Sequence, residues 1–150
     1  MDILPIQEDV LGWSSKWFPE ALEAAIPLTR RRRTFKVVSA PYFVALKLEA
    51  FEQRGRGDFI TSVDFEDVIC LFNGRETIVE EIRAVPELAR GLAGKFKRYL
   101  ESDDLYTAVE GFVMTEENPE KRKLRIINAF RLVAKISLSP SPPLHFYAAE

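Results

Sequence analysis

The chain has few of the side chains on which most catalytic sites are built. It contains one cysteine, Cys70, and one histidine, His145, in 150 residues. A single cysteine cannot form an internal disulfide, and it favours a reducing compartment. His145 lies in a stretch rich in proline and serine, which a fold does not position well. The chain therefore has too few histidines and cysteines for a histidine-assisted nucleophile or a His/Cys zinc site. Carboxylates, lysines and arginines remain as catalytic groups.

Long apolar runs and an excess of positive charge are also lacking. No stretch approaches the roughly 18 apolar residues of a membrane span, and no signal-peptide pattern is visible. The formal net charge is −2, which gives the whole chain no general attraction to nucleic acid. We therefore expect a cytoplasmic protein without membrane contact, in which binding of RNA would depend on a local patch.

What is present is enough apolar sequence, 47% of residues, for one domain with a proper core. We expect a single domain over residues 1–138 and a proline- and serine-rich tail over 139–150. The expected fold class is α+β, with a small, incomplete, mixed N-terminal sheet packed on a mainly helical bundle. Strands are predicted at 3–6 and 34–38. The first strand would leave an open edge that invites pairing with a second copy, which predicts a homodimer.

Apolar spacing, capping residues and helix-ending prolines and glycines predict the helical segments. They are expected over residues 19–25, 40–54, 61–73, 76–85, 87–100, 105–114 and 118–138. Trp13 and Trp17 precede the first of these helices. In a chain of this size we expect them to belong to the core or an interface.

The segment from 40 to 73 carries the most informative charges. Lys47 and Arg54 are seven residues apart, so they lie two turns apart on one helical stripe, among apolar side chains. The opposite stripe, which we expect to face water, comprises Ala45, Glu49, Glu52 and Gln53. Because a buried unpaired cation is costly, Lys47 and Arg54 require an anion or a polar cleft opposite them.

Acids follow within a few residues. Two glycines flank Arg56 in a predicted tight turn with positive φ, which leads to Asp58. Thr61 and Asp64 have the spacing of a capping box. Asp64 and Asp67 lie three residues apart and project from the same side of the next helix.

Two interpretations of these charges remain open at this point. One is a structural salt-bridge network, in which Lys47 or Arg54 is paired with a neighbouring aspartate. The other is an anion site, in which Lys47, Arg54 and Arg56 bind the phosphates of a substrate that carries its metal.

The same residues resemble a known family. The run YFVALKLEAF at 42–51, followed by RGRGD at 54–58 and SVDFEDVI at 62–69, resembles the second half of nucleotidyltransferase-like proteins of the AbiEii toxin family. MDILP at 1–5, with LGW at 11–13 and WFPEA at 17–21, resembles that family's middle segment. The likeness covers most of residues 2–83.

This resemblance implies roles for the matching positions. Asp2 would be a metal-binding carboxylate that helps to hold Mg²⁺, and Lys47 would contact the nucleotide phosphates. Asp64 would be a catalytic acid, with Asp58 and Asp67 as supporting acids. The implied activity is magnesium-dependent transfer of a nucleoside monophosphate from a nucleoside triphosphate to an RNA end or a protein hydroxyl, by the toxin of a toxin–antitoxin pair.

The family's first motif, a Gly-Ser turn followed by an Asp-x-Asp pair, would lie before Asp2. Since two-metal chemistry needs several carboxylates, we expect this chain not to transfer nucleotides alone. Three explanations stay open: a reading frame that starts upstream, loss of the catalytic half, or a second chain that supplies it.

Two further hypotheses are a non-catalytic protein that self-associates through the sheet edge, and RNA binding by the arginines at 30–33 with the last basic helix. A solvated loop would explain the arginine run equally well.

Overall fold

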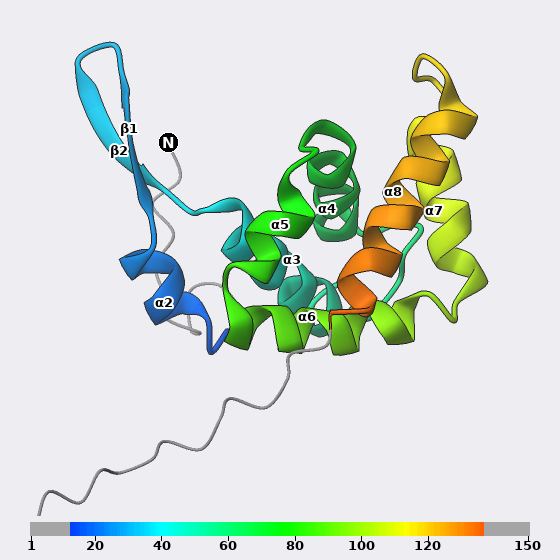
Figure 1. Cartoon of the computed structure of the whole chain (residues 1–150), viewed down its shortest axis with the longest axis horizontal. Coiled ribbons are helices and arrows are strands. Elements are labelled where there is room, and N and C mark those ends of the chain that lie inside the picture. The colour runs from blue at the N-terminus through cyan, green and yellow to red at the C-terminus, as the bar shows by residue number, and fades with distance from the viewer. Residues whose placement is uncertain (1–12, 137–150) are drawn as a thin grey trace, which may run out of the picture.

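A computed structural model of the chain describes residues 13–136. The expected first strand at 3–6, the tail at 139–150, Asp2 and His145 lie outside the described residues. Within them, the chain folds into helices that pack around one core, with a β-hairpin on one side (Figure 1).

The helices lie close to where the sequence predicts them. Their bounds are α2 (Phe18–Glu23), α3 (Ala40–Gln53), α4 (Val63–Gly74), α5 (Ile78–Arg83), α6 (Pro86–Tyr99), α7 (Asp103–Val113) and α8 (Pro119–Ala134). Three of the longer helices, α3, α6 and α8, have proline in the first turn, where the missing N–H costs no hydrogen bond. Among residues 13–136, no helix is both long and apolar enough to cross a lipid bilayer.

The α+β class with a small N-terminal sheet is confirmed. In the described residues the sheet consists of β1 (Ile26–Arg30) and β2 (Arg33–Val37), where Ile26 is opposite Val37 and Arg30 is opposite Arg33. The strands are antiparallel, whereas the expected sheet was mixed. β2 matches the predicted strand at 34–38, and β1 was not predicted. The hairpin stands away from the helices instead of lying flat on them (Figure 1).

A two-residue turn joins the two strands. Arg31 and Arg32 have φ angles of 49° and 62°, both in the left-handed region. This is the pattern of a type I′ turn, which matches the twist of a hairpin and favours Asn-Gly. An arginine in this region carries a conformational cost of roughly 1–2 kcal/mol. The predicted loop at 30–33 is therefore shorter than expected, because Arg30 and Arg33 belong to the strands.

Every described helix contributes to the core, and phenylalanines from four of them lie within it. Phe51 of α3, Phe65 of α4, Phe96 of α6 and Phe130 of α8 are all fully buried. Phe130 lies 4.8 Å from the Phe96 ring, centroid to centroid, and 6.3 Å from the Phe65 ring. These ring contacts hold the helices together, because large aromatic side chains pack closely in a protein interior.

Two details of the predicted helices need correction. Ala45 was expected to face water but is 1% exposed, because α3 is surrounded by other elements on more than one side. The capping box of Thr61 and Asp64 is wrong: Ser62 is the N-cap, and its hydroxyl accepts a hydrogen bond from the Phe65 amide at 3.3 Å. Trp13 and Trp17 are buried, as predicted.

The glycines of the α3–α4 loop have different purposes. Gly57 has φ +71°, which glycine adopts without strain. Gly55 was expected to need positive φ, but the constraint on it is space. A Cβ there would lie 2.7 Å from the Phe51 carbonyl oxygen and 3.0 Å from the Ser62 hydroxyl.

Two glycine-to-alanine substitutions should therefore change stability in opposite directions. Gly55→Ala should lower the unfolding temperature, since backbone atoms must move to admit the methyl group. Gly94→Ala, at an exposed position inside α6 with nothing near the new methyl group, should raise the free energy of unfolding by about 0.5–1 kcal/mol. Thermal unfolding of both variants tests this, and an unfolding temperature unchanged by Gly55→Ala would contradict the close packing of this loop.

Candidate functional site

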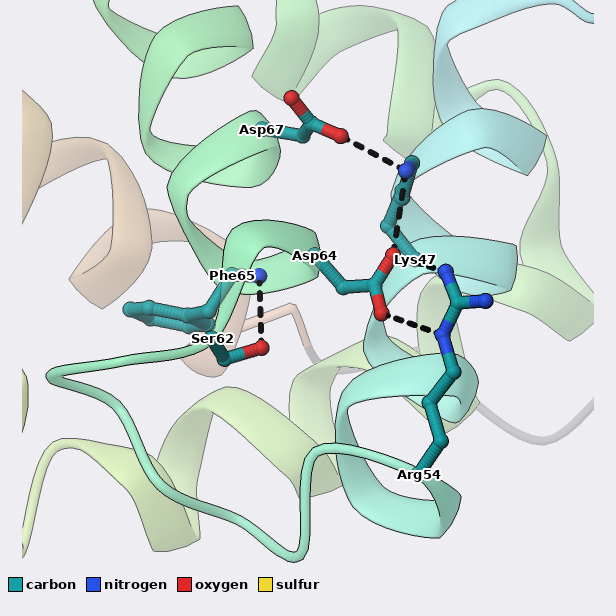
Figure 2. A network of polar contacts seen from close by, with 6 residues as sticks. All are labelled: Lys47, Arg54, Ser62, Asp64, Phe65 and Asp67. Carbon is teal, nitrogen blue, oxygen red and sulfur yellow. Dashed lines mark hydrogen bonds and ion pairs between the residues drawn. The ribbon is translucent and has the colours of Figure 1, made fainter.

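The predicted charges meet where α3 packs on α4 (Figure 2). Lys47 Nζ lies 3.1 Å from Asp64 Oδ1 and 2.6 Å from Asp67 Oδ2. Arg54 donates two hydrogen bonds to Asp64, from Nε to Oδ2 and from Nη2 to Oδ1, each 2.8 Å long. Two cations seven residues apart on α3 therefore bind two carboxylates three residues apart on α4, as the helical spacing predicts. We call Lys47, Arg54, Asp64 and Asp67 the ion-pair cluster.

Asp64 is the centre of the cluster. Its side chain is only 7% exposed, and it is the one charged or polar residue classed as buried among residues 13–136. Burial works to raise the pKa of this carboxyl group, but the hydrogen bonds and positive charges of Arg54 and Lys47 outweigh burial and hold its pKa below the ordinary value. Asp64 is thus an ionised carboxylate held between two cations.

Lys47 and Arg54 also make contacts with residues other than Asp64. Burial acts to lower the pKa of Lys47, yet its hydrogen bonds to Asp67 and Asp64 prevail and raise the pKa. The ammonium also lies 5.7 Å from the centroid of the Phe43 ring, and the Arg54 guanidinium lies 5.9 Å from the centroid of the Trp13 ring. These aromatic faces add a weaker attraction for the positive charge.

The charges in the cluster balance, with two cations facing two anions. This balance explains why Lys47 and Arg54 point inward from α3, as the salt-bridge interpretation predicts. The cluster is not sealed, however, because the Arg54 side chain is 51% exposed and the Asp67 side chain is 42% exposed. An outside ligand can therefore reach the guanidinium.

An open pocket of about 490 Å³ lies beside Arg54. It is bounded by the α3–α4 loop and by the first residues of α4, and its lining residues are Arg54, Gly55, Arg56, Asp58, Thr61, Ser62, Val63 and Asp64. Arg56 is exposed and has φ 52°, so the turn holds a second guanidinium at the pocket in a left-handed backbone conformation. We call this the loop pocket.

Asp58 lines the loop pocket but does not join the ion-pair cluster. Its carboxylate accepts hydrogen bonds from the Thr61 hydroxyl at 2.7 Å and from the amides of Ile60 and Thr61 at 2.9 and 3.2 Å. The Thr61 hydroxyl is the first of the causes that lower the pKa of Asp58. Asp58 therefore stabilises its own turn, and Thr61 is bonded to it instead of capping α4.

Sequence reasoning missed a second polar cluster on the other side of α3. Glu52, expected to face water, accepts hydrogen bonds from Lys95 Nζ and from the hydroxyl of Tyr99, both on α6. Burial is the main cause that raises the pKa of Tyr99, and the hydrogen bond to Glu52 raises that pKa further. Burial acts to raise the pKa of Glu52, but Lys95 and Tyr99 overcome it and lower the pKa. No local pattern could reveal this contact, since the partners are more than forty residues apart.

The described residues do not form a magnesium site. Asp64 Oδ1 and Oδ2 are both occupied by cations, and no group of three or more potential metal ligands occurs within residues 13–136. Mg²⁺ takes an octahedral set of oxygen ligands, and most of these would have to come from water or from the phosphates of a ligand if Asp67 were its carboxylate. Asp2, the metal ligand implied by the resemblance, lies outside the described residues.

Comparisons with protein-family models, with curated proteins and with solved structures found no match. The resemblance to the AbiEii family therefore stays a prediction that rests on the residues quoted for it.

Loss of the Asp64 charge should destabilise the fold in a pH-dependent way. Asp64→Asn should lower the free energy of unfolding by about 2–3 kcal/mol at about pH 7, because it leaves the Arg54 guanidinium without a carboxylate partner and two cations facing Asp67 alone. The folded-state pKa of Asp64 is below its unfolded value, so its contribution is complete above about pH 4 and is lost as the pH falls through the folded-state pKa.

The free energies of unfolding of the unmodified chain and of Asp64→Asn should therefore converge as the pH falls below the ordinary range of an aspartate. Urea unfolding at several pH values measures this. Asp67→Asn is the matched control, and it should cost less than about 1 kcal/mol because Asp67 is much more exposed. If the free energies of unfolding of Asp64→Asn and of the unmodified chain differed by the same amount at every pH, the ionised state of Asp64 would be contradicted.

Proposed function

We propose that this chain is a nucleotidyltransferase-like protein that binds the phosphates of a nucleoside triphosphate in the loop pocket and does not transfer nucleotides by itself. One observation carries the proposal. The polar residues that resemble the AbiEii family, Lys47, Asp64 and Asp67, come together at one place, and Arg54 joins that cluster to an open pocket that Arg56 also lines.

The geometry of Arg54 favours anion binding at the pocket. Its Nε and Nη2 atoms bond Asp64, and its remaining amino group, Nη1, has no hydrogen-bond partner in the described part of the chain. Asp64 therefore fixes the guanidinium plane while one edge stays available. An arginine fixed in this way loses little conformational freedom when a phosphate binds.

The first turn of α4 also lines the loop pocket, where its partial positive charge opposes the negative charge of Asp58 and Asp64. Ser62, Val63 and Asp64 all line the loop pocket, and α4 is a helix of 12 residues. The amides at the start of a helix carry partial positive charge and attract phosphate oxygens. With Arg54 and Arg56, this turn would surround a phosphate from two sides.

Magnesium would enter as part of the ligand. Because the aspartates of the ion-pair cluster are committed to Lys47 and Arg54, the cation would be held mainly by the phosphate oxygens of the nucleotide. Transfer to an RNA end or a protein hydroxyl, as the toxin of a toxin–antitoxin pair, would require metal-binding carboxylates beyond those of the described residues. An exposed free thiol, Cys70, fits the cytoplasm as the expected compartment.

A second candidate is a non-catalytic interaction protein that self-associates through its sheet. The observation that favours it is the exposure of Ile26, Leu28 and Val37, which are 55%, 53% and 44% exposed on the hairpin. A two-stranded ribbon with uncovered apolar residues is marginally stable in water and gains by pairing. Sedimentation equilibrium tests this candidate, and a monomer at every concentration would rule it out.

Calorimetric titration with a nucleoside triphosphate and magnesium tests the main proposal. We expect binding in the micromolar to millimolar range, weakened about tenfold by Arg56→Ala, which removes one charge-assisted contact. Arg56 is exposed and forms no ion pair with a described carboxylate, so this variant should keep the thermal stability of the unmodified chain.

The matched control is Arg83→Ala, which removes one exposed arginine from α5, away from the loop pocket. It should leave nucleotide binding unchanged. Absence of measurable heat at millimolar nucleotide, or equal weakening by Arg56→Ala and Arg83→Ala, would contradict the loop pocket as a phosphate site.

A further inference from the structure

The hairpin is the most strongly charged surface of the described chain. Residues 26–37, here called the basic hairpin, contain four consecutive arginines, Arg30 to Arg33, and Lys36. No acidic residue occurs from Ala24 to Leu48. Since the whole chain has a net charge of −2, the remainder of the chain has a net negative charge and the hairpin is a local positive patch without acids.

None of these five cations forms an ion pair with a carboxylate in residues 13–136. This contrasts with Lys47 and Arg54, which are both paired. All of the hairpin except Phe35 is exposed, and Figure 1 shows the hairpin projecting away from the helices. A ligand could therefore reach the charges from several sides.

The register of the strands determines where the arginines lie. Arg30 and Arg33 are directly opposite each other, next to the pair Thr29 and Thr34, whose hydroxyls lie 3.0 Å apart. The type I′ turn adds Arg31 and Arg32 at the tip. Four guanidinium groups thus gather at the end of a narrow ribbon.

The tip is also hollowed. Arg30, Arg31, Arg33 and Phe35 line an open pocket of about 530 Å³. Ile26 and Val37 lie at its opposite end, nearest to the helices, and Leu28 lies opposite Phe35 between the two ends. Positive charge is therefore at the free end of the hairpin, and its apolar side chains lie along the ribbon from the middle to the base.

We propose that the basic hairpin binds the phosphate backbone of double-stranded DNA. Each guanidinium can form two hydrogen bonds to one phosphate. A two-stranded antiparallel ribbon fits the major groove of B-form DNA. Arginines at its tip can therefore reach phosphates on both sides of the groove. The major groove of A-form RNA is too narrow and deep for such a ribbon. This inference does not depend on the nucleotide site proposed above.

Other occupants of the tip fit less well. A second copy of the hairpin would bring like charges together, which opposes pairing at this end. A hairpin that enters a lipid surface would carry its apolar residues at the tip, whereas here the tip consists of Arg30 to Arg33. A duplex presents closely and evenly spaced negative charges, which match four adjacent arginines.

Fluorescence anisotropy with the full chain and a labelled duplex of about 20 base pairs tests the proposal. Binding should weaken steeply between about 50 and 200 mM salt, with a log–log slope of about −3 to −4 if four phosphates are neutralised. Arg31→Asn combined with Arg32→Gly removes two charges while giving the type I′ turn the residues that it favours. This variant should bind at least tenfold more weakly, with a slope smaller by about 2.

The charge-matched control is Arg83→Gln combined with Arg90→Gln, which removes two exposed arginines from α5 and α6. It should leave the DNA affinity unchanged. Equal losses in the two double variants would show attraction to overall charge and would overturn the assignment to the hairpin, as would no binding at about 50 mM salt.

Other polyanions serve as comparison ligands in the same assay: single-stranded RNA, double-stranded RNA, polyglutamate and vesicles with anionic phospholipid. Duplex DNA should bind more tightly than each of these at equal salt. Equal or tighter binding of any of them would overturn the assignment to duplex DNA.

Discussion

Asp64 brings a negative charge into the contact between α3 and α4, and much of the site depends on how that charge is balanced. An ionised carboxylate that is 7% exposed is tolerated only if its oxygens are fully bonded. Lys47 and Arg54 provide these bonds, and their spacing along α3 brings both to the same carboxylate. The same bonds fix the Arg54 guanidinium at the edge of the loop pocket, so a stabilising interaction also positions the group proposed to meet phosphate.

The chain thus uses positive charge in two different ways. At the α3–α4 contact, the cations are neutralised by acids close in sequence, and the arrangement is compact and partly buried. On the basic hairpin, the cations are exposed and have no partner among the described carboxylates. The first arrangement stabilises the fold and leaves one guanidinium edge for a small anion, whereas the second has no evident structural purpose and suits a long polyanion.

The parts of this structure that could be predicted from sequence are those set by local geometry. Helical periodicity places Lys47 with Arg54 and Asp64 with Asp67, and a short loop brings the two helices together. The cap was assigned to Thr61 instead of Ser62, because neighbouring hydroxyls compete and only the structure shows that Thr61 bonds Asp58. β1 was missed because its turn is Arg-Arg instead of the Asn-Gly that usually signals a hairpin. The Glu52 cluster joins distant segments, so no local pattern contains it.

The most direct test of the central role of Asp64 is an NMR titration of its side-chain carboxyl carbon. The account predicts a pKa below the ordinary aspartate value near 3.8, and a rise toward or above that value in Arg54→Met, in which burial is less opposed by positive charge. A pKa at or above 3.8 in the unmodified chain, unmoved by Arg54→Met, would contradict the account.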